Sequence, residues 1–212
     1  MQGTSNYLEL KTSEEANAWA DRHFGAVLAM PSDSPLYKSI LGYTGSCYEQ
    51  WNPLLRRSPP IEEDSFSKHD RDFLGEELDE IKSVQAFLLQ NETPEDIVVY
   101  RYTRIKDVQS LCGRKLLRSG MYFSDKAFFS TTLVKGLLSE LGTHTLYTCI
   151  LKLYLPKGVP GAYVSLRDER SRLDEQEFLL PCGTEFEILR VHWWRFPWLI
   201  ECKALMKEKG RG

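Results

Sequence analysis

The sequence contains little that would build a metal site or a disulfide framework. Its five cysteines are scattered and odd in number, and no two of them form a CxxC pair. The four histidines show none of the spacings that are typical of zinc ligands. We therefore expect no metal, and we expect the cysteines to be free and partly buried.

Long apolar runs and an excess of positive charge are also missing. No apolar run approaches the roughly 20 residues that a helix needs to cross a bilayer. The formal net charge is −3, which gives no general attraction to nucleic acid or to an anionic membrane, so we expect neither as a partner. The first five residues do not resemble a signal peptide; a secreted protein would carry its signal elsewhere or have lost it.

What the sequence does contain is enough apolar material for a substantial core. Of its 212 residues, 42% are hydrophobic and 27% are charged, which is ordinary for a globular protein. There is no internal repeat and no low-complexity segment. The length predicts a single domain over residues 1–212, with a helical part at about 13–92 and a β-rich part at about 97–205.

The helical part divides at its prolines. Residues 13–57 have helical spacing that is broken around Pro31 and Pro35, and a second helix is predicted from about residue 46 to residue 55. Residues 68–90 carry the clearest amphipathic pattern. The second helix would bring three polar side chains onto one face at steps of four, which is either plain helix surface with a core tyrosine or the wall of a site: Tyr48, Asn52 and Arg56.

Short segments rich in β-branched and aromatic residues follow from residue 97. A short helix is predicted within 106–111. The predicted strands are 97–102, 128–132, 145–155, 162–166, 177–180, 185–191 and 198–204. Helices followed by a mostly antiparallel β part predict an α+β fold.

Two carboxylates stand close together before one of these strands. In an extended strand Glu175 and Glu177 would share a face, because side chains alternate with a period of two. Like charges this close raise each other's pKa and favour a nearby cation. The simpler alternative is a solvated start of a strand.

A cation and three hydroxyls lie on two other strands. Arg101 ends an apolar strand and needs an anion, which is either Glu175 or Glu177 or a ligand phosphate. Alternation directs Ser130 and Thr132 to one side of their strand and Thr131 to the other. Hydroxyls on strands often bond the backbone, so taken alone they indicate little.

Taken in order, these motifs resemble the arginine–serine–glutamate class of mono-ADP-ribosyltransferases, specifically the bacterial ADP-ribosyltransferase exoenzyme family. The likeness covers about residues 13–203. It implies N-terminal helices packed on a mostly antiparallel, two-sheet β core with a central NAD cleft. The stretches that carry it are 14–24, 43–45, 48–56, 98–101, 128–132, 155–158, 161–164 and 175–183.

The resemblance also implies a role for each catalytic residue. Glu177 would accept a hydrogen bond from the nicotinamide ribose and stabilise the positive charge that develops at C1′. Ser130 would hydrogen-bond that glutamate. Glu175 would orient the acceptor, and a carboxylate there favours a guanidinium, whereas relatives with glutamine tend to modify asparagine or other acceptors.

For NAD binding, the resemblance implies a set of residues from both parts of the chain. Arg101 would hold the phosphate–ribose portion, and Thr131 and Thr132 would support their strand. The implied NAD-binding residues are Arg101, Tyr48, Asn52, Arg56, Thr131 and Phe129. The turn 165–174 would read the protein substrate, although the simpler interpretation of its charged part, 167–172, is a solvated loop.

The sequence departs from the family pattern in three places. Tyr102 follows the strand arginine where glycine or a second arginine is usual. Thr132 replaces a commoner serine. The connector 135–144 lacks an arginine that contacts the NAD phosphates in relatives, and Lys135 or His144 would have to take its place.

The implied function is transfer of ADP-ribose from NAD to an arginine of a protein in a host or competitor cell. Such a protein would be secreted or injected and would act as a toxin or effector in the target cytoplasm. The alternatives are an NAD glycohydrolase, a nucleic-acid modifier, which the acidic balance disfavours, and a non-catalytic module on the same fold. A lectin-like β-rich binding domain would show no rise in thermal stability with NAD.

Overall fold

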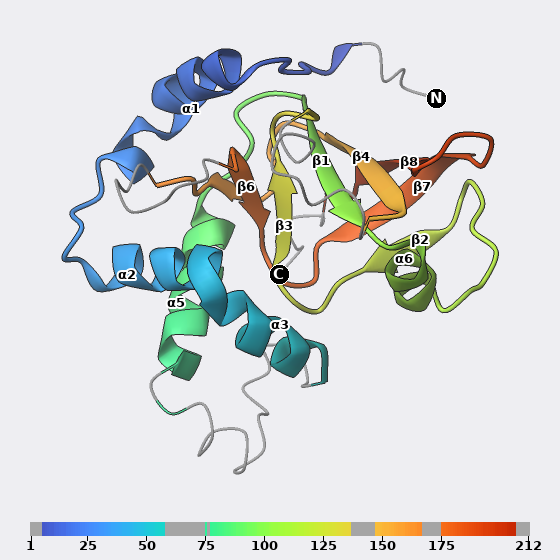
Figure 1. The fold of residues 1–212 in the computed structure, drawn as a ribbon. Coiled ribbons are helices and arrows are strands. Elements are labelled where there is room, and N and C mark those ends of the chain that lie inside the picture. Colours follow the sequence, from blue (N-terminus) through green and yellow to red (C-terminus); the bar gives the residue numbers. More distant parts are fainter. Residues whose placement is uncertain (1–5, 58–74, 76, 137–146, 167–174, 207–212) are drawn as a thin grey trace, which may run out of the picture.

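The computed structural model describes residues 6–57, 75, 77–136, 147–166 and 175–206. Its helices and strands confirm the predicted α+β class (Figure 1). The helical segments are α1 (Ser13–Leu28), α2 (Pro35–Gly42), the π-helical turn η2 (Tyr43–Cys47), α3 (Tyr48–Arg57), α5 (Glu77–Gln90) and α6 (Ile105–Cys112). The strands are β1 (Ile97–Thr103), β2 (Tyr122–Ser124), β3 (Phe129–Thr132), β4 (Cys149–Leu155), β5 (Ala162–Tyr163), β6 (Glu177–Leu180), β7 (Glu185–His192) and β8 (Trp198–Ala204).

The first helices begin where side chains can cap them. The Thr12 hydroxyl accepts the N–H of Glu15 at 3.2 Å, and two glutamates occupy the first turn of α1. Ser34 caps α2 in the same way, with Pro35 at the first helical position. The predicted break between α1 and α2 is therefore confirmed.

The second helical segment is longer than the sequence predicts. The prediction of a helix from about residue 46 is wrong at its start, because helical structure runs from α2 through η2 into α3. Tyr43 explains the difference. Its buried ring packs on Trp51 at 5.9 Å and on Phe128 at 5.1 Å between ring centroids, and this tertiary packing outweighs the weak helix propensity of Gly45. Of the helix predicted over 68–90, residues 68–74 and 76 lie outside the described residues.

The strands join into one sheet in the order β2-β7-β8-β4-β1-β3-β6-β5. All neighbours are antiparallel except β4 and β8, which are parallel. The expectation of two sheets needs correction: β1 and β3 are registered at one residue pair, Tyr100 with Thr132, and this narrow junction links two well-paired halves. For comparison, β1 and β4 are paired over seven residues.

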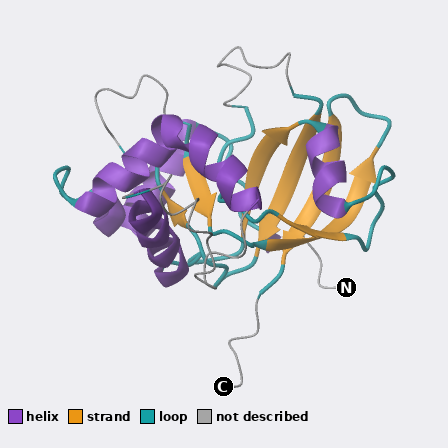
Figure 2. Ribbon diagram, turned by 90° about the horizontal axis from the view of Figure 1, so that it is seen from below, coloured by secondary structure: helices purple, strands orange, loops and turns teal. Residues whose placement is uncertain are grey.

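Helices α1, α2, α3 and α5 lie at one end of this sheet and α6 lies at the other (Figures 1 and 2). At the helical end, Phe178 of β6 packs on Phe24 and Trp19 of α1, with ring centroids 5.8 and 6.3 Å apart. All four residues of β6 are buried, which anchors the start of this strand, Glu177, at the edge of the core. None of the helices that the structure describes is both long and apolar enough to span a membrane.

Candidate active site

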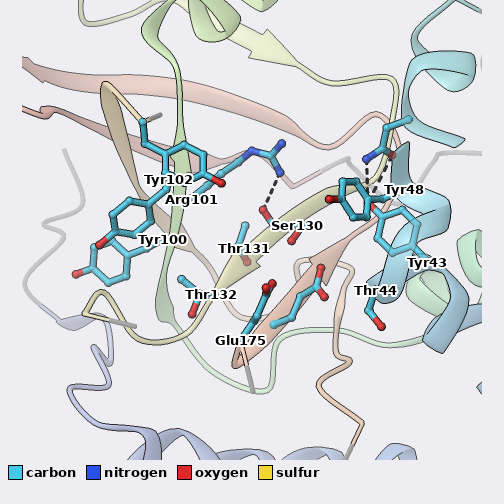
Figure 3. A pocket seen from close by; sticks show the side chains of 14 residues that line it. Tyr43, Thr44, Tyr48, Tyr100, Arg101, Tyr102, Ser130, Thr131, Thr132 and Glu175 are labelled. Atoms are coloured by element: carbon cyan, nitrogen blue, oxygen red, sulfur yellow. Dashed lines mark hydrogen bonds between the residues drawn. The ribbon is translucent and has the colours of Figure 1, made fainter. Parts of the chain in front are cut away.

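A cavity of about 420 Å³ opens where β1 and β3 separate (Figure 3). Its walls come from α3 and the turn before it, from β1 and β3, and from the start of β6. Most of the residues predicted for the site line this cavity, although they are spread over 130 positions of the sequence. The lining residues are Tyr43, Thr44, Gly45, Tyr48, Asn52, Tyr100, Arg101, Tyr102, Ser130, Thr131, Thr132, Tyr147, Glu175 and Glu177.

The two carboxylates reach this cavity through a tight turn. The prediction that they lie on one extended strand is wrong, because β6 begins at Glu177 and Gln176 has a left-handed backbone with φ of 49°. The turn is pinned by the fully buried Gln176 side chain, which accepts the Tyr163 hydroxyl at 3.0 Å and donates to Asn17 at 3.3 Å. The sequence analysis did not single out Gln176, because its partners Tyr163 and Asn17 lie 13 and 159 positions away and leave no local pattern.

The Glu177 carboxyl is held where its charge is disfavoured. Burial raises its pKa from 4.5 to about 7; a hydrogen bond with Ser130 opposes the rise, the nearby Glu175 adds to it and Arg101 opposes it. Burial also raises the pKa of Glu175. The backbone N–H of Glu177 donates to the Ser165 hydroxyl at 2.7 Å, which fixes the strand start. Such a carboxyl can stabilise a positive charge that a ligand develops beside it.

Arg101 is partly buried at the same junction. Among the described residues no ion pair joins it to either glutamate. Its guanidinium instead donates to the Ser130 carbonyl at 2.7 Å (Figure 3) and lies 4.3 Å above the Phe129 ring. Burial lowers the pKa of Arg101 because it disfavours the charged guanidinium. The anion of a ligand would compensate this charge. Phe129, predicted to bind NAD, is buried beneath the arginine and does not line the main cavity.

A second cavity of about 270 Å³ lies on the other side of Arg101. The structure places Arg56 here, away from Tyr48 and Asn52 of the main cavity. Asp125 explains the position, since its carboxylate accepts two N–H groups of Arg56 at 2.9 and 2.8 Å. This hydrogen bonding raises the pKa of Arg56. Asp125 has no motif around it and was not predicted.

The three hydroxyls of β3 have different partners. Thr131 donates to the Phe178 carbonyl at 2.5 Å, and the Thr132 hydroxyl accepts the N–H of Val134 at 3.3 Å. Both bonds are to backbone, so these side chains brace the strand; Thr131, which the resemblance also places in NAD binding, lines the cavity as well. Ser130 directs its hydroxyl toward Glu177.

The helical wall and the connectors complete the site. Asn52 donates to the Tyr43 hydroxyl at 3.2 Å, and Tyr48 is partly exposed at the wall. Tyr102 lines the cavity and donates to the Lys135 carbonyl; the Lys135 ammonium does not line the cavity. His144 and most of the predicted substrate-reading turn, 167–174, lie outside the described residues. All five cysteines are free, and no cluster of metal-ligating residues occurs in the described ranges.

Comparison with known proteins shows the family of the chain. The model of the ADP-ribosyltransferase exoenzyme family matches residues 16–195. The chain belongs to this family.

Relatives of this exoenzyme include the epidermal cell differentiation inhibitor of Staphylococcus aureus, which is 28% identical over 135 residues. The match covers 52% of each chain, so it spans about half the length of that relative. Among solved structures, C3stau2 from S. aureus with NAD has a TM-score of 0.73 at 19% identity and covers 95% of this chain and 99% of that one. BECa, an ADP-ribosylating toxin of a binary enterotoxin of C. perfringens solved with NADH, has a TM-score of 0.67 at 21% identity, covering 94% and 50%. These likenesses support the fold of the exoenzyme.

Proposed function

We propose that this exoenzyme is a mono-ADP-ribosyltransferase that uses NAD and modifies an arginine of a protein. The observation that carries the proposal is the buried Glu177, hydrogen-bonded with Ser130 and close to Arg101 in one cavity. Membership of the exoenzyme family and relatives solved with NAD or NADH support NAD as the substrate.

The cavity residues fit NAD on chemical grounds. Arg101 is a partly buried cation that lines both cavities, so it can meet the pyrophosphate of an extended dinucleotide. The nicotinamide ribose would then lie toward Glu177, whose carboxylate accepts the ribose hydroxyl. We infer that Tyr48 and Asn52 cover NAD from α3 and that Arg56, released from Asp125 or shared with it, adds to phosphate binding.

The reaction transfers one group. The bond between C1′ of the ribose and the nicotinamide nitrogen breaks, and nicotinamide leaves with the electron pair. Glu177 stabilises the positive charge left on the ribose. An acceptor guanidinium nitrogen forms the new bond to C1′, and Glu175, which a guanidinium can bind as a fork, orients it and takes its proton.

The target would be a protein of a host or competitor cell, reached by secretion or injection. The relatives that are named as toxins support this part of the proposal. The identity of Glu175 supports arginine as the acceptor, since it is the carboxylate that faces the cavity beside Glu177.

Nicotinamide release from NAD, with and without agmatine as an arginine mimic, tests the function. The wild type should release nicotinamide, and agmatine should accelerate release and become ADP-ribosylated. Glu177→Gln should lose both activities by about 10²–10³-fold. Glu175→Gln should lose transfer to agmatine but keep release into water. Release that ignores agmatine would indicate an NAD glycohydrolase, and release that survives Glu177→Gln would contradict the assignment.

A further inference from the structure

The sheet edge farthest from α1 carries an unusual surface, formed by the loop before β2 and the turn between β7 and β8. We call residues 113–122 and 189–198 the aromatic–basic edge. These two segments contain five of the chain's cations and no aspartate or glutamate, whereas the whole chain has a net charge of −3. The cations are Arg114, Lys115, Arg118, Arg190 and Arg195.

Large apolar side chains project from the same two segments. Trp194 is 81% exposed, Phe196 74%, Leu116 71% and Tyr122 59%. Among the described residues, these are the four most exposed large hydrophobic side chains of the molecule. Burying these side chains against a partner would be favourable, at about 25 cal/mol for each Å² of apolar surface removed from water. Their gathering at one edge therefore indicates a contact surface.

Both segments of the edge make hydrogen bonds or ring contacts with the sheet. His192 contacts Glu201 at 2.6 Å, and the Trp194 ring lies 5.1 Å from the His192 ring. Two backbone hydrogen bonds, from Gly120 to Ile188 and from Ile188 to Met121, join the loop to β7 at 2.8 and 2.7 Å. Both segments therefore adjoin β7, at the right of Figure 1.

We propose that the aromatic–basic edge docks on an anionic lipid bilayer. Tryptophan rings favour the boundary between headgroups and acyl chains, and each arginine or lysine near an anionic leaflet adds about 1 kcal/mol of attraction. The expectation of no membrane partner rested on the overall charge and on the lack of a spanning run. Neither excludes a local patch that lies on the surface.

The position of the edge favours lipid over the acceptor protein. In the sheet order, β4, β1 and β3 separate the edge strands from β6, whose start carries Glu177. A cationic surface also gives no attraction to the arginine that Glu175 is suited to receive. The edge therefore holds the enzyme at a membrane and leaves the catalytic cavity open to a protein found there.

Co-sedimentation of the whole chain with vesicles tests this inference without using the catalytic activity. The wild type should bind vesicles of phosphatidylcholine with phosphatidylserine and bind pure phosphatidylcholine far more weakly. Trp194→Ala combined with Phe196→Ala should weaken binding by about tenfold or more. Arg118→Gln and Arg195→Gln should each weaken it by about fivefold, which is 1 kcal/mol for each cation.

Two matched variants control for general effects. Leu89→Ala removes a half-exposed leucine from α5, and Arg22→Gln removes an exposed cation from α1; both should bind like the wild type. All variants should keep the circular dichroism spectrum and nicotinamide release of the wild type. Equal binding to both vesicles, undiminished binding by the double variant, or no binding to either vesicle would overturn the proposal, the last in favour of a protein partner.

Discussion

Glu9 is a partly buried carboxylate and Glu177 a buried one, and their surroundings shift their pKa values in opposite directions. Burial works against the charge of Glu9, but hydrogen bonds from Tyr100, Lys152 and Lys11 outweigh it and lower its pKa to about 2. At Glu177 burial prevails and the pKa rises to about 7. Hydrogen bonds therefore outweigh the cost of burial for the charge of Glu9, whereas they do not for the charge of Glu177. This difference separates a structural carboxylate from one that is kept for a ligand.

The largest expected effect is on the free energy of unfolding, which removing the charge of Glu177 should raise and removing the charge of Glu9 should lower. Because the pKa of Glu177 is raised, its ionisation costs the folded state up to about 3 kcal/mol above pH 7, and the cost disappears as pH falls below 4.5. Glu177→Gln should therefore raise the free energy of unfolding at pH 8 and change it little at pH 4.5. The stabilisation from Glu9 is present above pH 4.5 and lost toward pH 2, so Glu9→Gln should cost about 1–2 kcal/mol at pH 8. Urea unfolding of both variants at the two pH values measures this; shifts of the same sign at pH 8 would remove the contrast.

The second prediction concerns the pH dependence of catalysis. If ionised Glu177 stabilises the ribosyl cation, nicotinamide release should rise about tenfold per pH unit up to about pH 7 and level off above it. Ser130→Ala removes a hydrogen bond that lowers this pKa, so its profile should move to higher pH. Initial rates at saturating NAD between pH 5 and 9 decide the matter. A flat wild-type profile would show that Glu177 does not titrate in the reaction.

A third change tests whether Arg101 serves a ligand. Arg101→Lys keeps the charge but loses the planar fork, so the dissociation constant of NAD should rise about tenfold. Arg57→Lys, an exposed arginine of α3, is the matched control and should bind NAD like the wild type. Isothermal titration with NAD gives both constants. If Arg101→Lys binds NAD as tightly as the wild type, Arg101 only braces the sheet through its hydrogen bond to the Ser130 carbonyl.

The smallest expected effect is at the turn that carries the two glutamates. Gln176→Ala loses the bonds to Tyr163 and Asn17, which together hold the turn. We expect kcat for nicotinamide release to fall about fivefold, roughly 1 kcal/mol, with KM for NAD within about twofold. Steady-state kinetics separate the two parameters. A change confined to KM would place Gln176 in NAD binding instead of in the positioning of Glu177.

Local patterns were sufficient to predict much of the fold. The β8 segment, the apolar run of β6 and the start of β1 are confirmed, because buried strands show in composition and in their flanking turns. The three-residue β2 was missed, since its pairing with β7 is what makes it a strand. The early start of the second helical segment was missed for a similar reason, the packing of Tyr43.

The candidate site was predictable as a set of residues but not as an arrangement. The order of Arg101, Ser130 and Glu177 along the chain pointed to one cavity. The partnership of Arg56 with Asp125 joins residues 69 positions apart and leaves no local trace in the sequence. The shared orientation of Glu175 and Glu177 was expected from strand alternation, and it arises from the left-handed Gln176 instead.

The junction between β1 and β3 also has a mechanical consequence. Across it the two well-paired halves of the sheet are joined by one registered residue pair and by two side-chain bonds, from Arg101 to the Ser130 carbonyl and from Tyr102 to the Lys135 carbonyl. A seam this thin is where a sheet bends or parts most readily, whereas the seven pairs between β1 and β4 move together. We therefore expect the sheet to bend most readily along this seam, which borders the cavity proposed to bind NAD.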